Sequence, residues 1–224
     1  MVLTKFRWLG AAALLGLSSA ASADRILVLG DSLSAAYNMQ PSQGWVSLLD
    51  ARLQAQDPGR HQVINASISG ESSTGGLARL PALLQQYKPD VVVIELGGND
   101  ALQGQPMSLT RGNFERMIGL SQAAGARVAV LAVVVPAQFS RVEAAALAQM
   151  YTSVTRASDV PLQPSLMDGI SGRATLLQRD GLHPNAAAQP LVLGNAWPVI
   201  RARLSPQPVP RAPARLRWEQ PKPH

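Results

Sequence analysis

Two nearly uninterrupted apolar runs limit the folds that this chain can adopt. Residues 91–96 and 127–134 consist mostly of aliphatic side chains, which is the pattern of strands that are buried on both faces. Shorter strand candidates lie at 25–29 and 62–66, with a weaker one at 161–163. Strands buried on both faces occur in parallel sheets that helices cover on either side. The runs therefore predict an α/β domain with a central parallel sheet.

Amphipathic segments separate the predicted strands. They have apolar or alanine-rich sequences at helical spacing and cover 46–53, 77–87, 114–121 and 142–156. Asn185 is a good N-cap for a last helix over 186–204, which Pro190 and Pro198 should bend or break. Strands and helices in alternation predict one domain over residues 24–204.

Both ends of the chain have sequences that do not fit this domain. Residues 1–23 combine a basic start, a short apolar run and Ala21-Ser22-Ala23, which predicts a cleaved signal peptide and a periplasmic or secreted protein. An N-terminal membrane anchor is the alternative, although the apolar run is short for a bilayer. Residues 205–224 contain six prolines, which predicts a disordered or polyproline-like tail. The chain has no cysteine, so it can form neither disulfides nor a lipid anchor on cysteine.

The positive charge of the chain is concentrated at its ends. Of the formal net charge of +6, Lys5 and Arg7 carry two and residues 205–224 carry a net three, which leaves +1 for residues 24–204. A nucleic-acid-binding domain needs a basic surface of its own. We therefore expect no nucleic-acid partner. The basic tail is expected to be solvated, with contact to an anionic membrane or cell-wall polymer as the alternative.

Three short polar segments carry residues suited to acyl transfer. They are Gly30-Asp31-Ser32-Leu33-Ser34, Gly97-Gly98-Asn99-Asp100 and Asp180-Gly181-Leu182-His183-Pro184. The first two follow predicted strands, as does the loop around Gly70. Ligands of parallel sheets bind outside the carboxyl ends of the strands, so we expect the first two polar segments and the Gly70 loop to converge there.

Ser32, Asp180 and His183 supply the residue types of a serine hydrolase. Ser32 could act as nucleophile or, alternatively, cap a helix that begins near Leu33. His183 could act as the base, because a turn would let Asp180, three residues earlier, hold its Nδ1 proton. The alternative is a plain Asp-Gly turn before a His-Pro helix entry. The Gly-x-Ser-x-Gly motif of ordinary α/β-hydrolases does not occur in the chain.

Asn99 and Gly70 are candidates for the site that stabilises developing negative charge. The Asn99 side-chain amide can donate a hydrogen bond to an oxyanion, and Gly70 lets its backbone N–H approach a ligand closely. The alternatives are a tight turn at Gly98-Asn99 and an ordinary loop glycine at position 70. Each residue alone is weak evidence for a catalytic site, but together they fill the different roles that the reaction requires.

These segments resemble the four blocks of the SGNH (GDSL) hydrolases, and residues 25–204 are similar to the periplasmic branch of thioesterases, lysophospholipases and arylesterases. The resemblance implies a flavodoxin-like three-layer α/β/α sandwich. It implies Ser32 as nucleophile, His183 as general base and acid, and Asp180 as the residue that orients His183. The oxyanion hole would consist of the Ser32 N–H, the Gly70 N–H and the Asn99 side chain, with no metal or other cofactor.

One aspartate, two alanines and one loop have expectations of their own within this resemblance. Asp31 is expected to shape the turn rather than to carry protons. Ala36 and Ala101 stand where the branch often has glycine, which could alter the substrate cleft. The loop 101–108 is expected to line the acyl cleft and to move, with an ordinary surface connection as the alternative.

The sequence thus predicts an exported serine esterase that acts on carboxylic esters and on acyl thioesters or lysophospholipids. Its partners would be small ester, thioester or lipid substrates, and the mature protein would be a monomer without stable membrane insertion. A deacetylase of envelope polysaccharide is a second enzymatic interpretation. A third is a non-catalytic module that holds phosphate at a helix N-terminus after the first strand.

Overall fold

The structure, a computed structural model, describes residues 23–134 and 141–206. The predicted signal peptide and nearly all of the proline-rich tail lie outside the described residues and stay predictions. Within the described part of the chain, no helix has the length and apolar character needed to cross a membrane.

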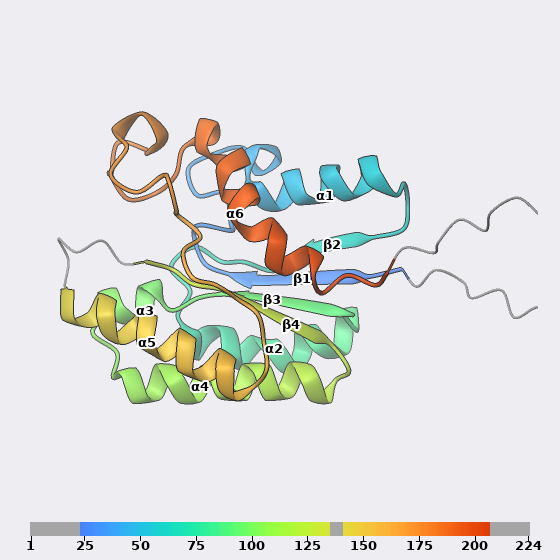
Figure 1. The fold of residues 1–224 in the computed structure, drawn as a ribbon, viewed down its shortest axis with the longest axis horizontal. Helices are drawn as coiled ribbons and strands as arrows, with labels where there is room; N and C mark the ends of the chain where they lie inside the picture. The colour runs from blue at the N-terminus through green and yellow to red at the C-terminus, as the bar shows by residue number, and fades with distance from the viewer. Residues whose placement is uncertain (1–22, 135–140, 207–224) are drawn as a thin grey trace, which may run out of the picture. The chain divides into compact units, whose positions relative to one another are not determined.

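A five-stranded parallel sheet forms the centre of the domain (Figure 1). In spatial order the strands are β2 (Gln62–Asn65), β1 (Arg25–Gly30), β3 (Val91–Glu95), β4 (Arg127–Leu131) and β5 (Leu162–Gln163). Every pair of neighbouring strands is parallel. The predicted α/β class and parallel sheet are therefore confirmed. β4 ends three residues earlier than predicted: Ala132 still bonds to Gln163 and Leu166, but the Val133 N–H donates to the Tyr151 hydroxyl at 3.4 Å instead of to a strand.

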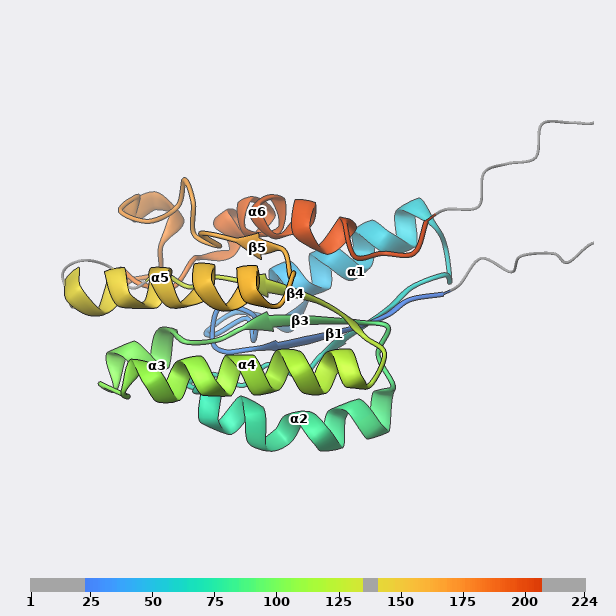
Figure 2. The same ribbon diagram turned by 60° about the horizontal axis from the view of Figure 1, so that its bottom comes forward.

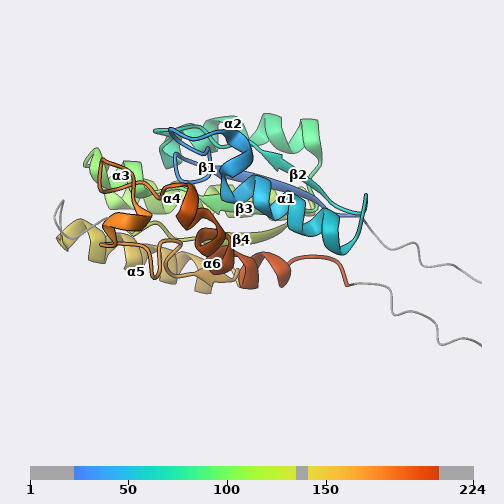
Figure 3. The same ribbon diagram turned by 90° about the horizontal axis from the view of Figure 1, so that it is seen from above.

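Helices cover both faces of this sheet, as Figures 1 and 2 show. One face carries α1 (Trp45–Gln56) and α6 (Gln189–Arg201). The other carries α2 (Ser73–Tyr87), α4 (Met107–Ala123) and α5 (Arg141–Ala157), while the short α3 (Gly98–Leu102) lies beyond the end of β3. Figure 3 views the α1 and α6 layer from above. The predicted three-layer α/β/α sandwich is confirmed.

Alternation along the strands gives each face its own core. In β1, Leu27 and Leu29 pack toward α2 and α4, whereas Ile26 and Val28 pack toward α1 and α6. Successive strand side chains point to opposite faces, so a strand with two covered faces must be apolar at every position. Full burial of one such side chain stabilises the fold by about 1.5–3 kcal/mol.

The last helix differs from the prediction in one respect. It begins as a 3₁₀ turn, η3 (Ala186–Ala188), which the Asn185 side chain caps by accepting from the Ala188 N–H at 3.3 Å. Pro190 then sits in the first turn of α6, where an N–H has no intrahelical acceptor, and α6 continues through Pro198. The predicted helix is therefore divided just before Pro190, whereas the expected break at Pro198 does not occur.

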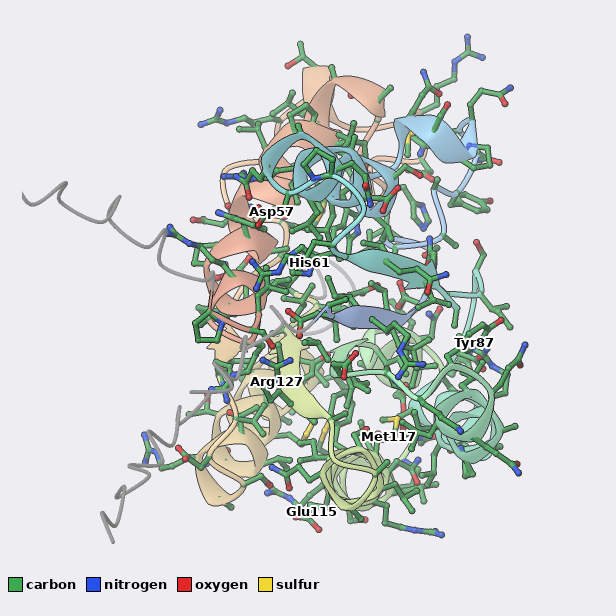
Figure 4. The ribbon with its side chains drawn as sticks, turned by 90° about the vertical axis from the view of Figure 1, so that its right-hand side faces the viewer. Asp57, His61, Tyr87, Glu115, Met117 and Arg127 are labelled. Carbon is green, nitrogen blue, oxygen red and sulfur yellow. The ribbon has the colours of Figure 1, made fainter. Side chains whose placement is uncertain are left out.

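A buried polar cluster closes the opposite, amino edge of the sheet, which Figure 4 views with His61 and Arg127 labelled. The fully buried Asp24 carboxylate accepts from the Ser205 N–H (2.7 Å), the Ser205 hydroxyl (2.8 Å) and Arg127. His61 Nδ1 lies 3.5 Å from the same carboxylate. The cluster thus joins the first and last residues of the domain to β4.

Candidate active site

The carboxyl edge of the sheet brings Ser32, His183 and Asp180 together. Ser32 follows β1, and Asp180 and His183 precede η3. The Ser32 Oγ lies 2.9 Å from His183 Nε2, and His183 Nδ1 lies 2.7 Å from Asp180 Oδ2. Residues 151 positions apart in the chain thus form one continuous hydrogen-bonded row.

A local turn sets the geometry of the Asp180–His183 pair. Asp180 Oδ1 accepts from the backbone N–H groups of Leu182 (2.9 Å) and His183 (3.0 Å), which leaves Oδ2 for the imidazole. Burial acts to raise the pKa of Asp180, but these hydrogen bonds and the interaction with His183 outweigh it. The pKa of Asp180 therefore lies below its ordinary value, and the carboxylate is ionised at neutral pH.

Of the predicted oxyanion donors, Asn99 lines the same pocket as Ser32. The backbone N–H groups of Ser32 and Gly70 have no hydrogen-bond acceptor among the residues that the structure describes. Asn99 Nδ2 donates to Asp31 Oδ2 (3.0 Å) and to the carbonyl oxygen of Glu71 (3.1 Å). Both amide hydrogens of Asn99 are thus engaged, and the bond to Glu71 must be shared or released before Asn99 can donate to a ligand.

The structure contradicts two alternative interpretations, namely Ser32 as a helix cap and Gly98-Asn99 as a plain tight turn. No helix begins near Leu33, because residues 32–38 form turns and the next helices start at Pro41 and Trp45. Ser32 is therefore not a helix cap. Asn99 lies in α3 rather than in a plain tight turn. As predicted, Asp31 shapes the first loop, where its Oδ1 accepts from the Leu33 N–H at 3.0 Å.

A glycine at position 97 lets the chain turn sharply from β3 into α3. Gly97 has a φ of 107°, a left-handed value that a residue with a Cβ rarely adopts. A Cβ at this position would also lie 2.5 Å from the hydroxyl oxygen of the buried Tyr151 of α5. That hydroxyl donates to the Leu96 carbonyl, so α5 holds the turn that carries Asn99.

A second buried network braces the segments that carry Gly70 and Asn99. The fully buried Asp100 accepts from the Ser73 N–H at 2.8 Å, from the Ser73 hydroxyl and from Gln105. Ser73 begins α2 just after the Gly70 loop, and Asp100 directly follows Asn99. This network is not apparent from the sequence, because its donors come from α2, from the loop that joins α3 to α4 and from α4 itself.

Tyr37 is a further residue that sequence reasoning missed. Its ring lies 4.5 Å from the His183 ring, centroid to centroid, at an interplanar angle of 39°. The residues on either side, Ala36 and Asn38, have left-handed φ values of 55° and 54°. The unusual alanine at position 36 was therefore a usable signal, since a glycine there would favour this backbone conformation.

An apolar pocket opens beside Ser32 and Asn99. Its apolar lining comes from loops at the carboxyl edge and consists of Leu33, Leu102, Val133, Val134, Met167 and Leu182. His183 and Asp31 also line it, whereas Gly70 and Ala101 do not. The loop 101–108 thus reaches the pocket through Leu102, and its motion stays a prediction. In the described part of the chain, no group of three or more metal-ligating side chains could hold a metal ion.

Comparisons with known proteins point to one family. The GDSL-like Lipase/Acylhydrolase family matches residues 28–190. Esterase TesA of Pseudomonas aeruginosa is 43% identical over 87% of this chain and 96% of its own length. Thioesterase 1/protease 1/lysophospholipase L1 of Escherichia coli K12 is 41% identical over 77% of this chain and 81% of its own length.

A solved structure supports the same assignment. The crystal structure of TesA superposes with a TM-score of 0.77 at 43% sequence identity, over 80% of this chain and 99% of that one. The fold, the family match and the identity over most of the chain agree with one another. The chain therefore belongs to the GDSL-like Lipase/Acylhydrolase family and is an ester hydrolase.

Proposed function

We propose that the protein is an exported serine esterase in which Ser32, His183 and Asp180 perform two-step acyl transfer. The hydrogen-bonded row from the Ser32 hydroxyl through His183 to Asp180 is the observation that carries this proposal. A serine hydroxyl is a weak nucleophile, and an imidazole at 2.9 Å is placed to accept its proton. The predicted signal peptide supports export to the periplasm or the medium.

In the first step, Ser32 Oγ attacks the carbonyl carbon of the ester while His183 Nε2 takes the hydroxyl proton. The ionised Asp180 stabilises the imidazolium that forms and fixes its orientation. Negative charge develops on the former carbonyl oxygen, where the free N–H groups of Ser32 and Gly70 and the Asn99 amide would donate hydrogen bonds. His183 then gives its proton to the leaving alcohol or thiol, and an acyl-enzyme remains.

In the second step, water replaces the leaving group. His183 accepts a proton from the water, whose oxygen attacks the acyl carbon, and then returns a proton to Ser32 Oγ as the acid leaves. None of these steps requires a metal or an organic cofactor.

The apolar pocket supports substrates with a hydrocarbon acyl group. Six aliphatic or thioether side chains line it, and they would bury an acyl chain whose carbonyl group lies beside Ser32 and Asn99. The relatives carry the names esterase, thioesterase and lysophospholipase, which fits carboxylic esters, acyl thioesters and lysophospholipids as substrate classes. A rate series over p-nitrophenyl ester and acyl-CoA chain lengths tests this, because a polysaccharide deacetylase should lose activity sharply beyond acetyl.

Replacement of the nucleophile tests the mechanism. Ser32→Ala should abolish hydrolysis of p-nitrophenyl esters and labelling by a fluorophosphonate probe, while circular dichroism and Tm stay at the wild-type values. Near-full activity of the folded variant would refute Ser32 as nucleophile. A wild-type protein that is folded but unreactive toward the probe would favour a binding module. The phosphate-binding form of that alternative has little structural support, since no helix starts directly after β1.

A further inference from the structure

A fully buried carboxyl group, Glu95, lies directly behind the nucleophile loop. It is the last residue of β3, and the strand register pairs it with Gly30, two positions before Ser32. Its Oε2 accepts from the backbone N–H of Asp31 at 3.2 Å and from the Ser34 hydroxyl at 2.6 Å. A Cβ at Gly30 would lie 2.6 Å from this oxygen, so the glycine makes the close approach possible. The acyl-transfer mechanism assigns Glu95 no role.

The other carboxyl oxygen of Glu95 has no donor. Oε1 is buried and has no hydrogen-bond donor among the described residues. No ion pair of the described part of the chain includes Glu95. An ionised carboxylate in such a place would lose its hydration without gaining a counter-charge, which costs several kcal/mol.

The neighbour of Glu95 is a second buried carboxyl group, that of Asp31. Burial raises the pKa of Glu95 well above its ordinary value, and the negative charge of Asp31 raises it further. The two residues are direct neighbours, because the Asp31 N–H donates to Glu95 Oε2 at 3.2 Å. Two negative charges this close in a buried place oppose each other, so one of the two carboxyl groups keeps a proton.

We propose that Glu95 is a positioning residue that works in its protonated form, donating a hydrogen bond from Oε1 to the Asp31 carboxylate. Oε1 is the oxygen left without a donor, whereas Oε2 already accepts two hydrogen bonds. Asp31 then keeps its negative charge and uses Oδ2 to accept from Asn99 Nδ2. This bond decides which way the Asn99 amide faces, since an amide turned by 180° would present its oxygen to Asp31.

This arrangement has a consequence for the oxyanion. With one proton on the pair, a single negative charge lies behind the Asn99 amide and orients it. Loss of the Glu95 proton would place a second negative charge behind Asn99. That charge would repel the negative oxyanion, which the hydrogen bonds of the site stabilise. The role deepens the proposed acyl-transfer function and rests on it. We therefore expect Glu95 to affect kcat much more than KM.

A glutamine can imitate the protonated acid. Its amide oxygen can accept from Asp31 N–H and Ser34, and its NH₂ group can donate to the Asp31 carboxylate. Glu95→Gln should therefore retain kcat within about threefold of wild type. Glu95→Ala should lower kcat by about 100-fold with little change in KM, comparable to the loss of one oxyanion donor. The exposed Glu115→Gln is the matched control and should leave both parameters unchanged.

Infrared difference spectra test the proton itself. At neutral pH the wild type should show the C=O stretch of a protonated carboxylic acid, which Glu95→Gln removes and Glu115→Gln does not. The other titratable groups that face the pair are Tyr151 of α5, which is protonated in its buried position, and His183, which faces Asp31. Neither of these gives a carboxylic-acid band, so the signal identifies the carboxyl pair.

Three results would overturn the proposal. They are the absence of the protonated-acid band, a Glu95→Gln variant that folds normally but loses as much kcat as Glu95→Ala, and a Glu95→Ala variant with wild-type kcat. If Glu95→Ala does not fold, the glutamine variant and the spectrum still decide. Failure of the acyl-transfer mechanism is recognised separately, because it would appear as activity in Ser32→Ala while the infrared band is unaffected.

Discussion

The ring of Tyr37 covers one face of His183, and its removal should slow catalysis by a small and calculable factor. His183 is neutral in the free enzyme when it acts as a base and becomes a cation as it takes the Ser32 proton. An aromatic face attracts a cation more strongly than a neutral ring, and the centroid separation of 4.5 Å is within the range of this attraction. The contact therefore stabilises the transition state more than the ground state.

The magnitude follows from the exposure of the contact. Tyr37 is 37% exposed, so the attraction is that of a solvated site, about 0.5–1 kcal/mol. One factor of ten in rate corresponds to about 1.36 kcal/mol, so Tyr37→Leu should lower kcat/KM by about two- to fivefold. Tyr37→Phe keeps the ring and should stay within twofold of wild type. Tyr87→Leu makes the same substitution at the last residue of α2, on the side of the molecule that Figure 4 views, and is the matched control.

Steady-state hydrolysis of a short p-nitrophenyl ester at neutral pH measures this effect. Fluorophosphonate labelling rates give a second measure that does not depend on deacylation. Wild-type kcat/KM in Tyr37→Leu would refute the reasoning. A Tyr37→Phe variant as slow as Tyr37→Leu would also refute it, because the hydroxyl and not the ring face would then be responsible.

Two other substitutions have defined outcomes. Asn99→Ala removes one proposed oxyanion donor and should lower kcat by about 10²–10³-fold with KM little changed, measured by steady-state kinetics; a loss below threefold would exclude that role. Asp24→Asn should lower Tm at neutral pH, because the carboxylate accepts from Ser205 and Arg127. The pKa of Asp24 is lowered in the fold, since these bonds outweigh the opposing effect of burial. Its stabilisation is thus present above the unfolded-state pKa near 4 and is lost as pH falls, so Tm of wild type and variant should converge in acid. A constant Tm difference from neutral to acid pH would contradict this.

The strands and most helices could be predicted because their patterns are local. A strand covered on both faces is apolar at successive positions, as in 91–96, and a helix repeats its apolar residues every three or four positions. The candidate triad could be predicted for a related reason. Asp180 and His183 lie in one turn, and Ser32 follows a strand whose carboxyl end had to lie at the ligand-binding edge.

The residues that support the site could not be found in this way. Tyr37, Asp100 and Glu95 act through contacts with side chains that lie in other elements. A buried glutamate inside an apolar run looks like a defect of the strand pattern until the register places it beside Gly30. The contact between Asp24 and Ser205 could not be predicted either, because the two residues are 181 positions apart and meet only at the amino edge of the sheet.

The sequence by itself determined the class of fold, the edge of the sheet at which the polar segments end and the residue types of an acyl-transfer site. These depend on side-chain periodicity and on the order of the segments, which every sequence displays directly. Tertiary structure alone decided which hydrogen-bond donors remain free, which ring covers His183 and which carboxyl group must keep its proton. Those properties depend on distance and burial, because a donor or a charge changes its energy according to the groups that replace water around it.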